Sequence, residues 1–238
     1  MPREARHQRE ARAFKILASL QRAYPNAHCE LKFSNPLELL IATILSAQCT
    51  DKMVNVVTAD LFRKYRSAAD YANADPGQLE QDLRRLGFFR MKARNIRACC
   101  QRLADCHGGL VPRSMEELIQ LDGVGRKTAN VVLGNAFDQN EGIVVDTHVG
   151  RLSRRMGFTR ESDPEKIEQE LMRFVPRESW ARFSHWMIWH GRRRCSARSP
   201  DCGGCEIQQL CPSAGKCGPA RPKREQLQYL RRGATPNV

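Results

Sequence analysis

Apolar residues recur at helical spacing along most of the chain. The segment from Pro36 to Ala47 is almost continuously apolar, which is typical of a buried helix. Val149, Leu152 and Met156 lie three and four residues apart, after an apolar run at 142–145. No segment shows the convincing alternation of a strand with one buried face. The pattern therefore predicts an all-α protein.

Helix starts are marked by residues that cap helices. Three positions combine a capping side chain with a proline that follows it: Asn35, Asp75 and Asp163. Ser114 has Glu117 three residues later, which is capping-box spacing. We expect a helix to begin at each position, and Gly87 to end the one that follows Asp75.

The size and the apolar content fit a globular protein. With 238 residues, 41% of them hydrophobic, the chain is long enough for one large domain or two small ones. Its longest apolar stretch is too short to span a bilayer. The charged N-terminus lacks the apolar core of a secretory signal. We expect a cytoplasmic protein without a membrane anchor.

The charge is strongly unbalanced. Lys and Arg number 39 against 26 Asp and Glu, a formal net charge of +13. Such an excess favours a polyanionic partner, because phosphate contacts release counterions and steer association. A well-solvated basic surface without a specific partner would have the same composition. Composition alone leaves both interpretations open.

A glycine-rich turn lies between two predicted helices. The sequence LDGVGRK (121–127) follows a short helix ending near Leu121 and leads into an apolar helix beginning near Arg126. Gly123 and Gly125 allow a sharp turn and close approach of another molecule. The unpaired N–H groups and positive dipole end of the second helix can accept a phosphate. A purely structural helix hairpin is the alternative, but the basic charge favours non-specific binding of duplex DNA.

Five of the ten cysteines crowd into residues 195–217. Four of them have the spacing C-x6-C-x2-C-x5-C: Cys195, Cys202, Cys205 and Cys211. In a reducing compartment such a run indicates a metal centre rather than disulfides. Structural zinc and an iron–sulfur cluster both accept four thiolates, and the uneven spacing mildly favours iron–sulfur. Cys217 lies beyond the pattern.

Four motifs together resemble the endonuclease III family of DNA glycosylases. They are LSAQCTD (45–51), LDGVGRKTANVVL (121–133), VDTHVGRL (145–152) and HGRRRC (190–195). The cysteine spacing also resembles that of the family's 4Fe–4S loop. The resemblance runs from about Ala13 to Cys211, nearly the whole chain, and its joint motifs are highly specific.

The resemblance implies two helical domains with a DNA-binding cleft between them. A six-helix domain would span 29–139 and contain the helix–hairpin–helix motif. A discontinuous iron–sulfur domain would combine 1–28 with 140–218. The ends lie outside the resemblance, and the Pro, Arg and Lys content of 219–238 predicts a flexible basic tail with, at most, a short helix near 225–232. The four cysteines would hold a 4Fe–4S cluster, and we expect a monomer.

The resemblance also assigns the chemistry. Lys127 would be the nucleophile and Asp146 the catalytic carboxylate of a bifunctional glycosylase and AP lyase. Its substrate would be double-stranded DNA containing an oxidised pyrimidine or an abasic site. An amine that attacks the sugar expels the base and leaves a Schiff base, which permits β-elimination. The alternatives are a surface lysine that contacts phosphate and an aspartate that caps the helix beginning at Thr147.

Further DNA contacts follow from the same resemblance. Gln48 would fill the gap left by the flipped base. Phe88, in place of the usual aliphatic residue, would wedge the duplex, and His148 would lie near the backbone or pack at a helix start. The turn would supply the remaining contacts: Gly123, Val124, Gly125 and Arg126. Asp122 stands where a proline is common, and an acidic group there would weaken phosphate binding.

Three rival functions remain to be weighed. The adenine glycosylase branch with the same fold lacks the nucleophilic lysine, so Lys127 disfavours it. A mismatch-specific thymine glycosylase stays possible, because pocket residues cannot be identified from one sequence. A non-enzymatic helix–hairpin–helix protein that uses its metal loop as a clamp is the rival of a different class.

Overall fold

The protein is all-helical throughout the part that the structure describes. The computed structural model describes residues 4–216, and these contain α-helices and short 3-10 turns but no strand. The first six helices are α1 (Arg6–Ala23), α2 (Pro36–Leu45), α3 (Asp51–Lys64), α4 (Ala68–Ala72), α5 (Pro76–Leu83) and α6 (Phe89–His107). The remainder are α7 (Met115–Leu118), α8 (Arg126–Ala136), α9 (Thr147–Arg155), α10 (Pro164–Met172) and α11 (Trp180–Arg193), with 3-10 turns η1 (Arg177–Ser179) and η2 (Gln208–Leu210). The all-α prediction is confirmed.

The predicted helix caps are present. The side chains of Asn35, Asp75 and Asp163 each accept a hydrogen bond from a backbone N–H in the first turn that follows. Ser114 likewise accepts from the backbone N–H of Glu117, and its hydroxyl donates to that residue's carboxylate. Caps are local, so a single sequence is enough to predict them.

The predicted end of α5 is wrong. The helix stops at Leu83, where Arg84 already donates to Gln81 in a tighter turn. Gly87 does not have the left-handed backbone of a helix-ending glycine. Phe88 takes that conformation instead, with a φ of 57°, and α6 begins directly after it.

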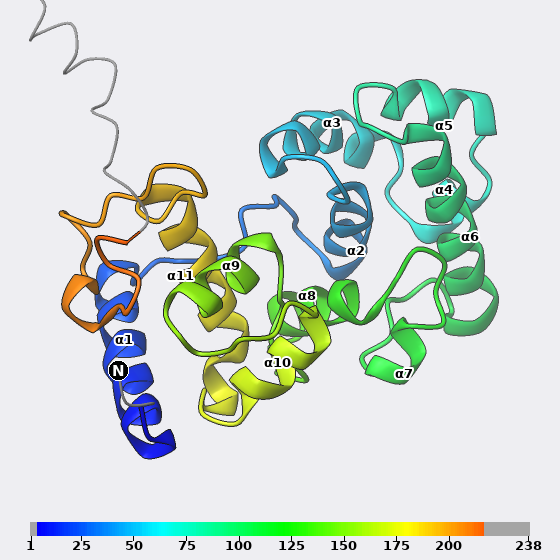
Figure 1. Ribbon diagram of the computed structural model, residues 1–238. Coiled ribbons are helices and arrows are strands. Elements are labelled where there is room, and N and C mark those ends of the chain that lie inside the picture. Colours follow the sequence, from blue (N-terminus) through cyan, green and yellow to red (C-terminus); the bar gives the residue numbers. More distant parts are fainter. Residues whose placement is uncertain (1–3, 217–238) are drawn as a thin grey trace, which may run out of the picture.

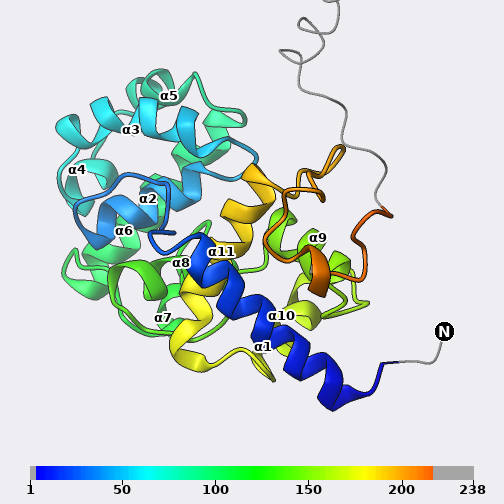
Figure 2. The ribbon, with the colours of Figure 1, turned by 90° about the vertical axis from the view of Figure 1, so that its left-hand side faces the viewer.

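The buried side chains form two separate hydrophobic clusters. One draws on residues between Leu31 and Leu133, from α2 through α8. The other combines α1 with residues between Ile143 and Ile207. In both ribbon views α1 lies beside α11, although the two are far apart in sequence (Figures 1 and 2). We call these the α2–α8 lobe and the cluster lobe.

Helix α8 lies where the two lobes meet. It packs against α2 on one side and against α11 on the other. The contact with α11 is close, because a Cβ atom on Gly134 would lie 2.9 Å from the Cβ of Ala181. Helix α8 is thereby held at the junction of the two lobes.

The expected basic tail at 219–238, the short helix near 225–232 and Cys217 all lie outside the described residues. Within residues 4–216, no helix is both long enough and apolar enough to cross a membrane.

Candidate active site and cysteine centre

The glycine turn leaves the start of α8 open. Gly123 has a φ of +76°, and a Cβ atom placed on it would lie only 3.0 Å from the Asn95 side chain. Gly125 is the N-cap and offers no side chain to the free N–H groups of α8. A Cβ atom placed on Gly125 would meet no other part of the protein within 4 Å. Val124 between them is buried and anchors the turn. These features suit the approach of an anion to the helix start.

Lys127 and Asp146 line the same two cavities. Lys127 is exposed in the first turn of α8, and Asp146 is half-buried immediately before α9. Both line a cavity of about 680 Å³ that extends towards α10. Both also line a second cavity, of about 290 Å³, that reaches α11 and the C-terminal end of α2. The structure thus brings the two predicted catalytic side chains together from two helices.

Asp146 is also a helix cap. Its Oδ1 accepts a hydrogen bond of 2.8 Å from the backbone N–H of Val149. The capping interpretation of this residue is confirmed. A carboxylate has two oxygens, so one can cap α9 while the other serves the cavity.

Two predicted DNA-contacting residues occupy strained turns. Gln48 lines the second cavity with a φ of 55°, and Phe88 is 59% exposed with a φ of 57°. A left-handed backbone at a residue other than glycine costs about 1–3 kcal/mol and is concentrated at functional sites. Both turns therefore present an exposed side chain at an energetic cost, although insertion into DNA stays a prediction.

The side chain of Arg126 binds within the protein. Its Nε and Nη2 donate to the two carboxylate oxygens of Glu168 on α10, at 3.0 and 3.1 Å. Asn130 donates to the same carboxylate at 3.1 Å. Glu168 is buried, and the ion pair raises the pKa of Arg126. The guanidinium thereby fastens α8 to α10, although the side chain stays 44% exposed.

Sequence reasoning missed Glu168 and Asn130. Glu168 lies 42 residues from Arg126, within an ordinary amphipathic helix, so no local pattern distinguishes it. The only hint is Gly142, where a Cβ would collide with the Glu168 carboxylate.

His148 packs where α9 meets α11. Its Nδ1 lies 3.2 Å from Nη2 of Arg151. A Cβ atom placed on Gly191 of α11 would lie 2.6 Å from the same Nδ1 of His148. Burial lowers the pKa of His148, with Asp146 opposing the shift. The packed histidine considered from the sequence is present, and a DNA contact by this residue stays a prediction.

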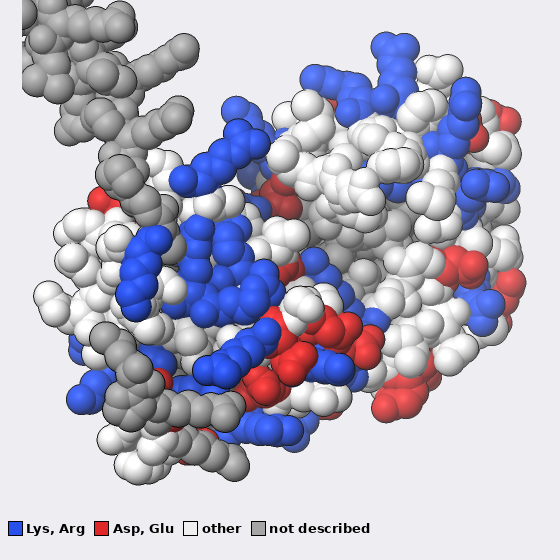
Figure 3. Space-filling model, in the orientation of Figure 1, with Lys and Arg blue, Asp and Glu red and all other residues white. Residues whose placement is uncertain are grey.

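The arginines ahead of the cysteine loop are largely engaged. Arg192 binds Glu30 and Asp51, the latter at 2.7 Å, and so joins the two lobes at the second cavity. The Arg193 guanidinium lies 3.7 Å above the Trp189 ring. Figure 3 shows Lys and Arg gathered on the face that carries α9, beside a patch of Asp and Glu over α10.

The four predicted metal ligands line one common cavity: Cys195, Cys202, Cys205 and Cys211. All four are free thiols. Burial raises the pKa of Cys205 to about 11, so this thiol stays protonated unless a metal replaces its proton. Four convergent thiols without a disulfide fit a four-thiolate cluster.

Helix α9 connects this cavity to Asp146. Arg155, near its C-terminal end, donates to the Sγ of Cys195 at 3.2 Å and to the carbonyl of Ser196 at 2.7 Å. Arg151 donates to the carbonyl of Cys195 at 3.0 Å. The cysteine loop therefore supports the helix that Asp146 caps.

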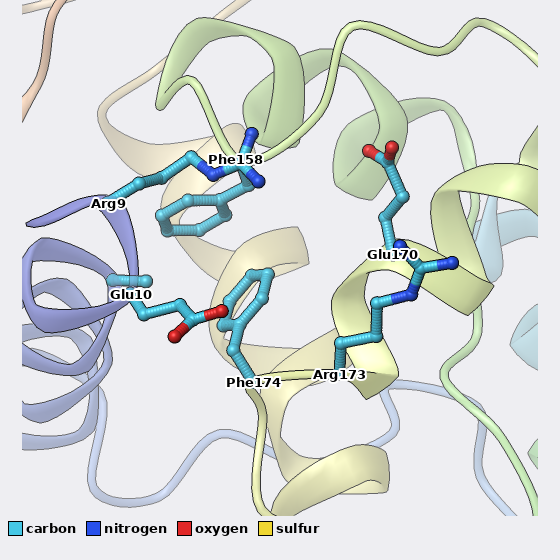
Figure 4. Close-up of a pocket in the computed structure, with 7 residues that line it drawn as sticks. Arg9, Glu10, Phe158, Glu170, Arg173 and Phe174 are labelled. Atoms are coloured by element: carbon cyan, nitrogen blue, oxygen red, sulfur yellow. The ribbon is translucent and has the colours of Figure 1, made fainter. Parts of the chain in front are cut away.

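A further cavity, of about 80 Å³, lies between α1 and α10 (Figure 4). Phe158 and Phe174 meet there edge to face, with ring centroids 5.3 Å apart. Arg and Glu side chains complete the lining, which includes no amine, thiol or metal-ligand set. It shares no residue with the two cavities around Lys127 and Asp146.

Comparison with known families gives two matches. Residues 41–177 match the HhH-GPD superfamily of base excision DNA repair proteins. Residues 195–211 match the iron–sulfur binding domain of endonuclease III, so the cofactor expected at the four cysteines is a family feature.

Individual relatives agree with these matches. The chain is 49% identical to endonuclease III of Synechocystis sp. over 87% of this chain and 94% of that protein. It is 46% identical to endonuclease III of Bacillus subtilis, over 81% and 88% of the two chains. Endonuclease III of Escherichia coli is 41% identical over 85% and 95%.

Solved structures match as well. A non-covalent endonuclease III–DNA complex superposes with a TM-score of 0.83 at 47% identity, covering 87% of this chain and 97% of that one. A trapped covalent endonuclease III–DNA intermediate gives the same values. A thermostable thymine-DNA glycosylase, at 21% identity and a TM-score of 0.78, shares the fold. The chain therefore belongs to the endonuclease III family, within the HhH-GPD superfamily, and carries that family's 4Fe–4S cluster.

Proposed function

We propose that this protein is a base-excision-repair DNA glycosylase and AP lyase that acts on oxidised pyrimidines in duplex DNA. The observation that carries the proposal is that Lys127 and Asp146 line the same two cavities, beside an open helix start. The trapped covalent DNA complex of a relative at 47% identity supports a covalent mechanism.

Lys127 is the nucleophile in this proposal. Its neutral amine attacks C1′ of the deoxyribose, the glycosidic C–N bond breaks, and the base leaves with that electron pair and takes up a proton. Asp146 stabilises the positive sugar as the base departs and accepts the proton that the amine loses. The C1′–O4′ bond of this adduct then breaks, O4′ takes up a proton, and the opened sugar is left as a Schiff base on Lys127. The Schiff base acidifies the C2′ proton, and loss of that proton expels the 3′ phosphate by β-elimination.

The open start of α8 binds a phosphate of the same strand. Its backbone N–H groups and positive dipole end supply the contact, from the turn formed by Gly123, Val124, Gly125 and Arg126. Gln48 and Phe88 enter the stack once the damaged base is flipped out. His148 lies beside the backbone of that nucleotide. The net charge of +13 adds a non-specific attraction.

We assign the domains along the two hydrophobic clusters. A domain at 29–139 would contain the helix–hairpin–helix, and 1–28 with 140–218 would form the iron–sulfur domain. Cys195, Cys202, Cys205 and Cys211 would ligate the cluster, which cross-links the loop that supports α9. The bacterial relatives suggest a cytoplasmic enzyme at the nucleoid, working as a monomer.

A panel of duplexes, each with one defined lesion, tests this function. Base release and strand scission are assayed separately on every duplex. We expect both products from ring-saturated and oxidised pyrimidines and neither from undamaged DNA. Efficient release of thymine only from a G·T mismatch would replace this proposal with a mismatch glycosylase. Tight duplex binding without any base release would favour the non-enzymatic clamp.

A further inference from the structure

Helix α6 contains a buried lysine. Lys92 is only 4% exposed, and it stands on the apolar face of the helix beside Ala93 and Ile96. Lysines are almost never fully buried unless a partner receives the ammonium group. The Nζ of Lys92 lies 3.1 Å from the Sγ of Cys49, which is half-buried. The lysine and the thiol therefore form a pair inside the α2–α8 lobe.

This pair connects the two strained turns. Cys49 follows Gln48 directly, and its backbone N–H donates to Ser46 at 3.0 Å. The backbone N–H of Lys92 donates to the carbonyl of Phe88 at 3.1 Å, in the first turn of α6. The side-chain contact thus joins the turn of Gln48 to the turn of Phe88.

We propose that Cys49 and Lys92 form a peroxide-responsive modification site. The Cys49 thiolate attacks one oxygen of hydrogen peroxide, so an S–O bond forms and the O–O bond breaks. The sulfur loses two electrons, the peroxide gains them, and the released hydroxide takes a proton to become water. The product is a sulfenic acid, and its anion is held by the Lys92 ammonium at the position where the thiol stood.

The other cysteines of this lobe have different surroundings. Cys99 and Cys100 are fully buried, and burial raises the pKa of Cys99 to about 12 and that of Cys100 still higher. Burial also raises the pKa of Cys29 to about 11. Cys106 is exposed near the end of α6, so it is the natural internal control for reactivity by exposure alone.

Oxidation would change the DNA-binding turns. An added oxygen lengthens the contact between Cys49 and Lys92, and the enclosed Lys92 side chain has little room to retreat. The turns that carry Gln48 and Phe88 must then move relative to each other. This consequence rests on the proposed function, whereas the thiol chemistry does not.

The experiment uses the cluster-loaded protein and a brief exposure to dilute hydrogen peroxide. Free thiols are then blocked, dimedone traps sulfenic acid, and mass spectrometry compares the peptides of Cys49 and Cys106. We expect Cys49 to react first despite its lower exposure, and a thiol reductant to reverse the change. Faster loss of Cys106 would overturn the proposal.

Two variants distinguish the effect of the Lys92 charge on the oxidation rate of Cys49 from the effect of thiol exposure. Lys92→Met should slow oxidation of Cys49 about tenfold or more, since it removes the adjacent charge, and should leave Cys106 unchanged. Lys92→Arg should retain most of the reactivity. Cluster absorbance and circular dichroism confirm that each variant is folded. An unchanged Cys49 rate in folded Lys92→Met would refute the role of the lysine, and if that variant does not fold, the order of Cys49 and Cys106 in the parent protein decides.

The functional consequence has its own readout. Peroxide treatment should weaken affinity for a lesion-containing duplex several-fold in the parent protein and leave the affinity of Cys49→Ala at its untreated value. Equal affinity before and after stoichiometric Cys49 oxidation would refute the coupling to the turns. Failure of the untreated protein to act on any lesion would instead refute the proposed function, without affecting the thiol result.

Discussion

Two helices begin at the same cavity, and they begin differently. Helix α8 starts at Gly125, which offers no side chain to the free N–H groups. Helix α9 starts at Asp146, whose own carboxylate occupies that position and accepts from Val149. The positive end of α8 is therefore open to an external anion, whereas α9 brings a negative charge of its own.

This difference divides the tasks of the site. The open start of α8 suits a DNA phosphate, and Lys127 lies in the same first turn. The closed start of α9 places a carboxylate where a positive sugar would form. The loss in stability at α8 is small, because glycine is only a few tenths of a kcal/mol poorer than serine or aspartate as an N-cap. A glycine cap in place of an aspartate cap therefore costs α8 little stability, and it leaves the helix start able to bind an external anion.

The largest effect is expected for Lys127→Ala. Removing the amine should eliminate Schiff base formation and strand scission, because Lys127 is the one lysine among the described residues that line the two cavities. Duplex affinity should change little, since the backbone of α8 meets the phosphate. Borohydride trapping and a binding titration measure the two properties side by side. Trapping at the parent level by this variant would remove Lys127 from its role.

Asp146→Asn separates the cap from the charge. Asparagine caps a helix as well as aspartate does, so the melting temperature should stay close to that of the parent. Base release should nevertheless fall by about 10²–10⁴-fold, the usual contribution of a proton-transfer group. Asp146→Ala is the matched comparison and should also lose about 1 kcal/mol of stability with the cap. If Asp146→Asn kept full activity, Asp146 would be a cap and nothing more.

Gly125→Asp closes the open helix. An aspartate cap and its charge at the dipole end should stabilise α8 by about 0.5–1 kcal/mol. The same carboxylate should weaken duplex binding roughly tenfold, because it displaces and repels the phosphate. Gly125→Ser is the uncharged control and should show a smaller loss. Thermal melts and salt-dependent titrations test both effects, and unaltered affinity in Gly125→Asp would place the phosphate elsewhere.

The smallest change in affinity is expected for Arg126→Ala. The guanidinium is already bound to Glu168, so its loss should alter duplex affinity less than about threefold while the backbone N–H remains. Stability should fall by about 1–3 kcal/mol, since the buried carboxylate loses its partner. Urea unfolding and duplex titration measure the two effects. A tenfold loss of affinity with unchanged stability would show that the side chain binds DNA directly.

Local features were predictable from the sequence because their causes are local. Asn35, Asp75 and Asp163 cap the helices that were expected to follow them. Asp146 was considered as a cap, and it is one. Cysteine spacing within seventeen residues likewise constrains how the four thiols can converge.

Contacts between distant segments were not predictable in this way. The ion pair of Arg126 with Glu168 and the link from Arg192 to Asp51 depend on how the helices pack. The left-handed turn at Phe88 was missed because the adjacent Gly87 is the residue that normally takes this conformation. The burial of Lys92 does have a sign in the sequence, because this lysine occupies a position of the apolar face of α6.

The most direct test of the account is to locate the covalent bond. The protein is incubated with a duplex that contains one ring-saturated pyrimidine, reduced with borohydride, digested, and mapped by mass spectrometry. The account predicts a single sugar adduct on the ε-amino group of Lys127. An adduct on the terminal amine or on another lysine, with Lys127 unmodified, would contradict it.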